Sequence, residues 1–313
     1  EMRESDWSSD VCSSDLIAGP TGVGKTSLSV ELAKACHGEV ISGDSMQVYK
    51  EMSIGTAKIT KEEMQEVPHY LIDFCSFIEE YNVKIFQEKA REYIAEITKH
   101  GHLPIICGGT GLYIKSCLYD YQFVDQPQDT EFMNFLAERS TDEIWGMLSV
   151  IDPKACENLH PHNRQRIVRA LAMAHTGEKK SEIVESQEHR PVYDAYIIGL
   201  TMDRSRLYER INARVDTMME QGLLQEIEQL HTLQEDVWSL QSFQGIGYKE
   251  WKAYIEDRES VATCVERIKK NSRNFAKRQY TWFRNQMQVH WYDVEDENYR
   301  EKILEDVEAW MEN

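Results

Sequence analysis

Residues 16–26 read Leu-Ile-Ala-Gly-Pro-Thr-Gly-Val-Gly-Lys-Thr, and from Gly19 to Thr26 they match the pattern G-x-x-x-x-G-K-[ST] completely. Glycines in this pattern let backbone N–H groups turn inward around a phosphate, the lysine adds a positive charge, and the threonine hydroxyl can bind Mg²⁺. A strand end precedes the motif and a helix start follows it. The stretch therefore predicts a phosphate-binding loop, but on its own it does not distinguish a kinase, a GTPase or a transferase.

Strand and helix patterns alternate on both sides of this loop. A helix continues over 27–36, the apolar spacing at 83–100 predicts another, and the apolar runs at 39–45, 103–111 and 195–202 predict buried parallel strands. After residue 203 the pattern is helical, over 204–231, 248–257 and 260–285. The alternation predicts an α/β fold with a doubly wound parallel sheet, like that of P-loop NTPases.

Domain boundaries follow from changes in this pattern. Residues 1–15 are rich in Ser and Asp and aperiodic, so we exclude them from the fold as a segment foreign to the rest of the chain. This leaves a short apolar stretch before the phosphate loop, where a central strand is needed. Residues 16–120 are expected to form the first part of the core, 121–193 a helical insertion domain, and 194–313 the second part with C-terminal helices.

Composition limits the partners of the chain. The net charge is −19, which argues against RNA, but the charge is segregated: residues 266–284 hold seven bases and one acid, and 293–313 hold nine acids and two bases. A local basic face is what attracts phosphates. We interpret the acidic C-terminal helix as solvated. Scattered cysteines without a C-x-x-C pair predict free thiols and a cytoplasmic location, and no apolar stretch predicts contact with a membrane.

Polar residues follow two of the predicted strands. Asp44 and Ser45 end the stretch at 39–45, Met46 and Gln47 follow it, and Gly108–Gly111 end the next strand, with Thr110 among them. Ligands bind beyond the carboxyl ends of strands in such sheets. Asp44 can therefore take a proton or bind Mg²⁺, Ser45 and Gln47 can bond a base edge, and Thr110 can reach a leaving-group oxygen. Helix capping by Asp44, Ser45 or Thr110 is the alternative.

Eight motifs in order resemble the bacterial tRNA dimethylallyltransferase (IPP transferase) family, from about Leu16 to about Phe283. They are GPTGVGKT, DSMQVY, IGTAK (54–58), VPHYLID (67–73), GGTGLY (108–113), RQRIVRAL (164–171), GIGYKE (245–250) and FAKRQYTWFR (275–284). The resemblance implies transfer of a dimethylallyl group from dimethylallyl diphosphate to the exocyclic amine of the adenosine immediately 3′ of the anticodon, in tRNAs that read codons starting with U. It also implies Mg²⁺ as cofactor, and we expect a monomer.

The resemblance also implies roles for individual residues. Asp44 corresponds to the general base, Thr110 to the catalytic threonine near the bridging oxygen, and Arg214 to the arginine that clamps the diphosphate, with Lys25 beside it. Thr26 corresponds to the Mg²⁺ ligand. The diphosphate would be held by Gly19, Thr21, Gly22, Val23, Gly24, Lys25 and Thr26.

Three segments are expected to contact the anticodon stem-loop of tRNA. The first is Asp44 to Gln47, and the second is Gln165, Arg166, Ile167, Val168 and Arg169, where helical spacing puts Gln165 and Arg169 on one face. The third comprises Arg273, Lys277 and Arg278, which the basic helix carries toward backbone phosphates. Solvated charged faces are the alternative for the last two segments, and we interpret Phe275, Tyr280, Trp282 and Phe283 mainly as core.

Three other functions share part of this pattern. A small-molecule P-loop kinase would share the loop but leaves the basic C-terminal helix unexplained. An adenylate isopentenyltransferase would share the chemistry, but the insertion and RQRIVR favour tRNA. A non-catalytic nucleotide- or RNA-binding module does not account for Lys25, Thr26, Asp44 and Thr110 together.

Overall fold

A computed structural model of the chain describes residues 13–123, 129–177, 179–182 and 190–312. These residues form two compact units, one made of the segments up to Tyr119 and from Pro191 onward, the other of Asp120–Arg190. Each unit has its own hydrophobic core.

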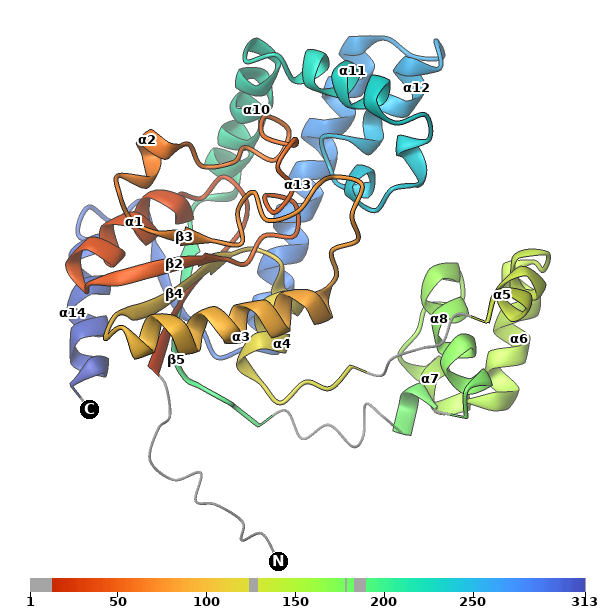
Figure 1. The fold of residues 1–313 in the computed structure, drawn as a ribbon, viewed down its shortest axis with the longest axis horizontal. Helices are drawn as coiled ribbons and strands as arrows, with labels where there is room; N and C mark the ends of the chain where they lie inside the picture. Colours follow the sequence, from red (N-terminus) through yellow and green to blue (C-terminus); the bar gives the residue numbers. More distant parts are fainter. Residues whose placement is uncertain (1–12, 124–128, 178, 183–189, 313) are drawn as a thin grey trace, which may run out of the picture. The chain divides into compact units, whose positions relative to one another are not determined.

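The first unit is built on a six-stranded, all-parallel sheet (Figure 1). The strand order is β3-β2-β4-β1-β5-β6, which confirms the predicted α/β class. In chain order the strands are β1 Ser13–Ala18, β2 Gly38–Ser42, β3 His69–Tyr70, β4 Leu103–Gly108, β5 Asp194–Thr201 and β6 His290–Asp293.

Strand β1 corrects the exclusion of residues 1–15 for Ser13, Ser14 and Asp15 only, because residues 1–12 lie outside the described ranges. It begins at Ser13 and includes Ser14 and Asp15, which pair with Ala195 and Tyr196 of β5. A polar residue contributes its backbone to a sheet as well as an apolar one does, because the ladder bonds N–H and C=O groups. The phosphate loop thus follows a central strand of six residues.

Both faces of the sheet are buried, as the continuous apolar strand runs predict. Leu16 and Ala18 belong to one core cluster, and Ile17 between them belongs to the other. Helices α3 (Val83–Lys99) and α4 (Gly111–Leu118) contribute to the first cluster. Helices α1 (Lys25–Ala35) and α14 (Tyr299–Met311) contribute to the second, through Leu28 and Ile303 among others. The acidic C-terminal helix is therefore solvated on one face only.

The remaining helices of this unit form a layer that includes the long α13 (Val261–Gln286) packed against α10 (Arg204–Glu220) (Figure 1). The predicted helix over 204–231 is two helices, because Gly222 (φ 99°) separates α10 from α11 (Leu223–Leu233). Shorter elements complete the unit: α2 Lys61–Met64, α12 Lys252–Ile255 and the 3-10 turns η1 Val237–Ser239, η2 Ser242–Gln244 and η3 Lys249–Trp251.

The second unit is helical in its described part. It contains α5 Thr130–Ala137, α6 Thr141–Ile151, α7 Pro153–Glu157 and α8 Arg164–His175. Its core is small and includes Leu136, Ile144, Leu148 and Ile167. No helix in the described ranges is long and apolar enough to cross a membrane.

Candidate active site

The phosphate loop joins β1 to α1 through backbone that requires glycine. Gly22 (φ 81°) and Gly24 (φ 111°) both lie in the left-handed region that favours glycine. Gly24 is the N-cap of α1, and no side chain caps that helix end. The first N–H groups of α1 are therefore available to an anion.

Lys25 lies folded over this loop. Its ammonium donates to the carbonyl oxygens of Gly19 (3.0 Å) and Pro20 (2.8 Å). Burial lowers the pKa of Lys25 from its ordinary value of 10.5 to about 8, and the charges of Cys107 and Asp44 oppose that shift while Arg214 adds to it. A cavity of about 390 Å³ adjoins the lysine, lined by Gly22, Gly24, Lys25, Thr26, Arg210, Ala213, Arg214 and Thr217. Its cations and free N–H groups suit a diphosphate.

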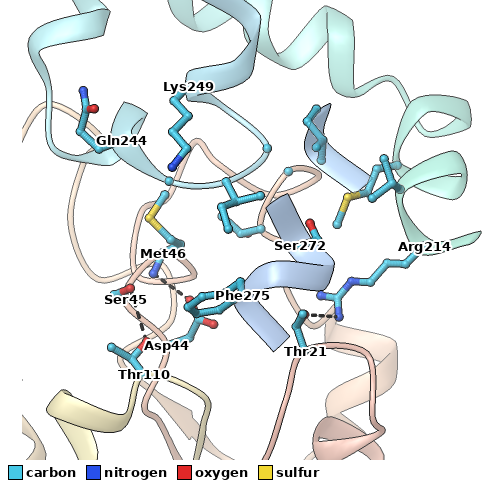
Figure 2. A pocket seen from close by; sticks show the side chains of 18 of the residues that line it. Thr21, Asp44, Ser45, Met46, Thr110, Arg214, Gln244, Lys249, Ser272 and Phe275 are labelled. Atoms are coloured by element: carbon cyan, nitrogen blue, oxygen red, sulfur yellow. Dashed lines mark hydrogen bonds between the residues drawn. The ribbon is translucent and has the colours of Figure 1, made fainter. Parts of the chain in front are cut away.

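Arg214 is carried to the loop by α10. Its guanidinium donates to the hydroxyl of Thr21 (3.4 Å), as Figure 2 shows. Burial lowers the pKa of Arg214, and the carboxylate of Asp44 opposes this. Arg214 lines both the cavity beside Lys25 and a second one on the other side of Thr21. The residue thus forms a shared wall between two compartments.

The second cavity, which we call the main cavity, has a volume of about 460 Å³. Figure 2 shows Asp44, Ser45 and Thr110 on one side of it and Thr21 with Arg214 on the other. Apolar side chains from α10 and α13 complete the wall, among them Ile211, Val215, Met218, Ile268 and Phe275. Three of the four predicted catalytic residues, Asp44, Thr110 and Arg214, therefore line one compartment, although they come from three separate parts of the chain; the fourth, Lys25, lines the cavity of about 390 Å³.

Asp44 holds the turn after β2 with one carboxylate oxygen. Oδ1 accepts hydrogen bonds from the backbone N–H groups of Met46 (2.8 Å) and Gln47 (3.2 Å). Within the described part of the chain no hydrogen bond engages Oδ2. The turn leads into no helix, so Asp44 is not a helix cap, and its second oxygen is available to accept a proton.

Thr110 occupies the N-cap of α4 without capping it. The side chain makes no cap hydrogen bond, and its hydroxyl instead lies 3.5 Å from that of Ser45. A threonine at this position ordinarily bonds the N–H groups of the first helical turn. The hydroxyl donates instead to that of Ser45, and both residues line the main cavity, where a ligand oxygen can replace Ser45 as the acceptor.

Gln47 lies apart from the other three residues of its segment. Its amide donates to the carbonyl oxygens of Thr56 (3.4 Å) and Ala57 (3.2 Å), and it is not among the residues that line the main cavity. Asp44, Ser45 and Met46 do line it. The amide predicted to bond a base edge is therefore used to hold the loop that contains IGTAK.

The three basic residues predicted on α13 differ in their surroundings. Arg273 is half-buried and donates to the side-chain oxygen of Asn212 on α10 (2.6 Å), so its charge is used inside the fold. Lys277 and Arg278 are exposed and line a groove of about 480 Å³ with Trp282 and neighbouring polar residues. Arg278 also lines the main cavity. Two of the three residues thus present a basic surface.

In the second unit, α8 carries the other predicted RNA contacts. Gln165, Arg166 and Arg169 are exposed, and Val168 is half-buried. Ile167 is fully buried in the core of that unit, so its side chain offers no surface to RNA. Helical geometry explains the difference, since Ile167 lies two positions after Gln165 and so points to the opposite side of α8.

Three functional candidates were not predicted from the sequence. Burial lowers the pKa of Lys180, and the charges of Arg166 and Arg169 add to that shift. Lys249 lines the main cavity from the GIGYKE segment. Gln279 is buried on α13, at a position that shares its face with Cys264, Ile268, Ala276 and Phe283. A polar residue on an apolar helix face is the signal that could have identified it.

Comparison with known proteins agrees with these features. The family model described as IPP transferase matches residues 47–286. A tRNA dimethylallyltransferase of Bacillus cereus (strain ATCC 10987 / NRS 248) is 52% identical over 302 residues, covering 95% of each chain, and one of Bacillus anthracis is equally similar, covering 95% of this chain and 96% of its own.

Solved structures give the same result. A tRNA isopentenylpyrophosphate transferase of Bacillus halodurans is 40% identical, with a TM-score of 0.73 and coverage of 97% of both chains. A eukaryotic dimethylallyltransferase acting on tRNA has a TM-score of 0.85 at 29% identity, covering 96% of this chain and 80% of its own.

Proposed function

Because the chain belongs to the IPP transferase family, we propose that its main cavity is where a dimethylallyl group passes from dimethylallyl diphosphate to tRNA. The acceptor is the exocyclic amine of the adenosine immediately 3′ of the anticodon, in tRNAs that read codons starting with U. The observation that supports this proposal is the shared wall: Thr21 and Arg214 of the phosphate-binding side line the same compartment as Asp44 and Thr110.

The reaction is a displacement at the first prenyl carbon. The adenine amine forms the new C–N bond as the bond between that carbon and the diphosphate oxygen breaks. Asp44 accepts the amine proton through the oxygen that the turn leaves free. The Thr110 hydroxyl donates to the bridging oxygen, and Lys25, Arg214 and the loop N–H groups stabilise the charge on the departing diphosphate.

The compartment also suits the prenyl group itself. Val215 and Met218 of α10 and Ile268 of α13 provide an apolar wall beside Arg214. An allylic group that becomes cationic while its leaving group departs is protected there from water. Positioning in a dry, apolar compartment is a general means of lowering such a barrier.

Mg²⁺ fits the phosphate side of this site. The Thr26 hydroxyl is exposed at the start of α1 and lines the cavity that holds Lys25 and Arg214. Among the described residues, no group of three or more His, Cys, Asp or Glu could hold a metal ion. Mg²⁺ prefers phosphate oxygens and water beside one or two protein ligands, so Thr26 and the diphosphate would hold it and neutralise the leaving group.

Location and assembly complete the proposal. We expect a monomer in the cytoplasm, where its RNA substrate is found.

A transfer assay tests the proposal. The protein is incubated with Mg²⁺, labelled dimethylallyl diphosphate and an anticodon stem-loop RNA with adenines following the anticodon. Asp44→Ala is assayed in parallel, with Asp142→Ala, an exposed acid of α6, as the matched control. Label on RNA with the wild type and control, lost in Asp44→Ala, is the expected result. Label on AMP instead of RNA, or ATP turnover without transfer, would overturn it.

A further inference from the structure

Gln279 joins the two loops that carry the reacting groups. Its side-chain oxygen accepts the backbone N–H of Thr21 (3.0 Å), and its side-chain nitrogen donates to the carbonyl oxygen of Gly109 (2.9 Å). Thr21 follows β1 and Gly109 follows β4, and these strands are neighbours in the sheet. The residue is 5% exposed, so water does not substitute for either bond.

Helix α13 lies very close to the backbone of the two glycines that flank Thr110 in the loop after β4. A Cβ atom on Gly109 would lie 2.1 Å from the Gln279 side-chain nitrogen, and one on Gly111 would lie 2.2 Å from the Trp282 ring. Both distances are far below van der Waals contact. Gln279 and Trp282 are one helical turn apart, so α13 contacts the backbone on each side of Thr110.

Thr110 depends on these contacts for its orientation. It makes no capping hydrogen bond that would fix its side chain to α4, and its hydroxyl donates across the cavity to the Ser45 hydroxyl at 3.5 Å. At the other end of the bridge, the Thr21 hydroxyl accepts a hydrogen bond from Arg214. The side-chain amide of Gln279 therefore links the backbone of Gly109, next to Thr110, to the backbone of Thr21, whose hydroxyl bonds Arg214.

We propose that Gln279 is a positioning residue that sets the spacing between Thr110 and the Thr21–Arg214 pair, so that bridging oxygen and diphosphate are engaged together. The inference rests on the proposed function. An amide fits both partners at every pH, because it offers an acceptor to Thr21 and a donor to Gly109. An ionised carboxylate offers acceptors alone and would repel the Gly109 carbonyl oxygen.

Gln279→Met tests the proposal, since methionine is similar in size and forms neither bond. Reacting groups misplaced by about 1 Å can cost on the order of 10²-fold in rate. We expect the single-turnover rate of prenyl transfer to fall at least about tenfold, with the Kd values for inorganic pyrophosphate and for the stem-loop RNA changed less than about threefold. Gln229→Met, on the exposed face of α11, is the control and should keep the wild-type rate.

Gln279→Glu provides a readout that a merely structural role would not move. Protonation turns the carboxylate into a carboxylic acid that can donate to Gly109 again. We expect the transfer rate of this variant, relative to wild type at each pH, to rise as the pH is lowered from about 8 to about 6. If Gln279→Met does not fold, as judged by thermal unfolding, the pH dependence of the Gln279→Glu rate relative to wild type is the test of the positioning role.

The outcomes separate this inference from the function on which it rests. No transfer by the wild type would refute the proposed function. Wild-type transfer with an unchanged rate in Gln279→Met, or a Gln279→Glu ratio that does not vary with pH, would refute the positioning role and leave the function standing.

Discussion

Asp44 illustrates how one side chain can both build and use this site. Its Oδ1 accepts two backbone N–H groups and so fixes the turn after β2, while the other oxygen makes no hydrogen bond among the described residues. The turn bonds hold the carboxylate in one orientation without consuming its second oxygen. Substitutions at Asp44 therefore change both the local backbone and the chemistry, which is why the transfer assay needs a folded-state control.

Lys25 is expected to set the alkaline limit of diphosphate binding. Burial lowers the pKa of its ammonium to about 8, and only the charged form attracts an anion. Its charge is present below about pH 8 and is lost as the pH rises through that value. The Kd for pyrophosphate should therefore rise between about pH 7.5 and pH 9.5, as measured by calorimetric titration.

Lys25→Arg is the matched variant for this measurement, because a guanidinium keeps its charge over the whole range. Its affinity for pyrophosphate should vary little with pH. A wild-type affinity that stays constant up to about pH 9.5 would contradict the assignment of Lys25 as the titrating group.

At the scale of elements, the sequence predicted those that have a strong periodic signal. The strand at 103–108 and the helix at 83–99 lie within two or three residues of the predicted ranges. Strand β6 was not predicted, because its four residues lie at the sheet edge with exposed ends at His290 and Asp293 and so show no apolar run. The break at Gly222 was missed because a helical pattern continues across it.

The same reasoning explains which site residues could be predicted. Asp44 and Thr110 lie two residues after strand ends, and Lys25 begins the helix after the phosphate loop that follows β1, so local pattern and sheet geometry place them together. Gln279 bonds Thr21 across 258 positions of the chain. That contact depends on how α13 packs, which no local pattern specifies.

Glu226 on α11 is expected to stabilise the loop that follows Met52. Its buried carboxylate accepts the backbone N–H groups of Ser53, Ile54 and Gly55 (2.7–3.1 Å) and the hydroxyl of Tyr248 (2.7 Å). Removing it leaves four donors without their acceptor. Glu226→Ala should lower the free energy of unfolding by roughly 3 kcal/mol, measured by urea denaturation.

Glu228→Ala provides the comparison, since Glu228 is an exposed acid two residues away on the same helix. Its unfolding midpoint should differ little from that of the wild type. Equal midpoints for the two variants would show that the carboxylate of Glu226 does not hold the loop.

For the whole molecule, the net charge of −19 does not show that some basic side chains are paired within the fold while others are exposed. Lys269 pairs with Asp216 (2.7 Å), Arg267 with Glu259 (2.6 Å), and Arg273 with the neutral Asn212. These charges are used within the fold. Lys277 and Arg278 on α13 and Arg166 and Arg169 on α8 remain exposed, so a chain that is acidic overall still has basic surfaces.

The double substitution Arg166→Ala/Arg169→Ala is expected to weaken tRNA binding and to reduce its salt dependence. Each lost phosphate contact lowers the slope of log K against log salt by about 0.7 to 0.9. The slope should therefore fall by up to about 2, measured by fluorescence anisotropy at several salt concentrations. The Kd for pyrophosphate should not change.

Lys61→Ala/Lys99→Ala removes the same number of charges from exposed positions of the first unit and serves as the control. It should leave the slope near that of the wild type. An equal decrease in both double variants would mean that net charge alone, and not the α8 surface, governs binding.

The contact between Gln279 and Gly109 also constrains how such a chain can evolve. The two positions are separated by 170 residues, yet a side chain gained at 109 would collide with the amide at 279. The two positions are therefore expected to change together. A shorter side chain at 279 would make room for a side chain at 109, but the hydrogen bonds from residue 279 to Thr21 and Gly109 would be lost. Descendants should therefore inherit the two as a pair, or abandon them together.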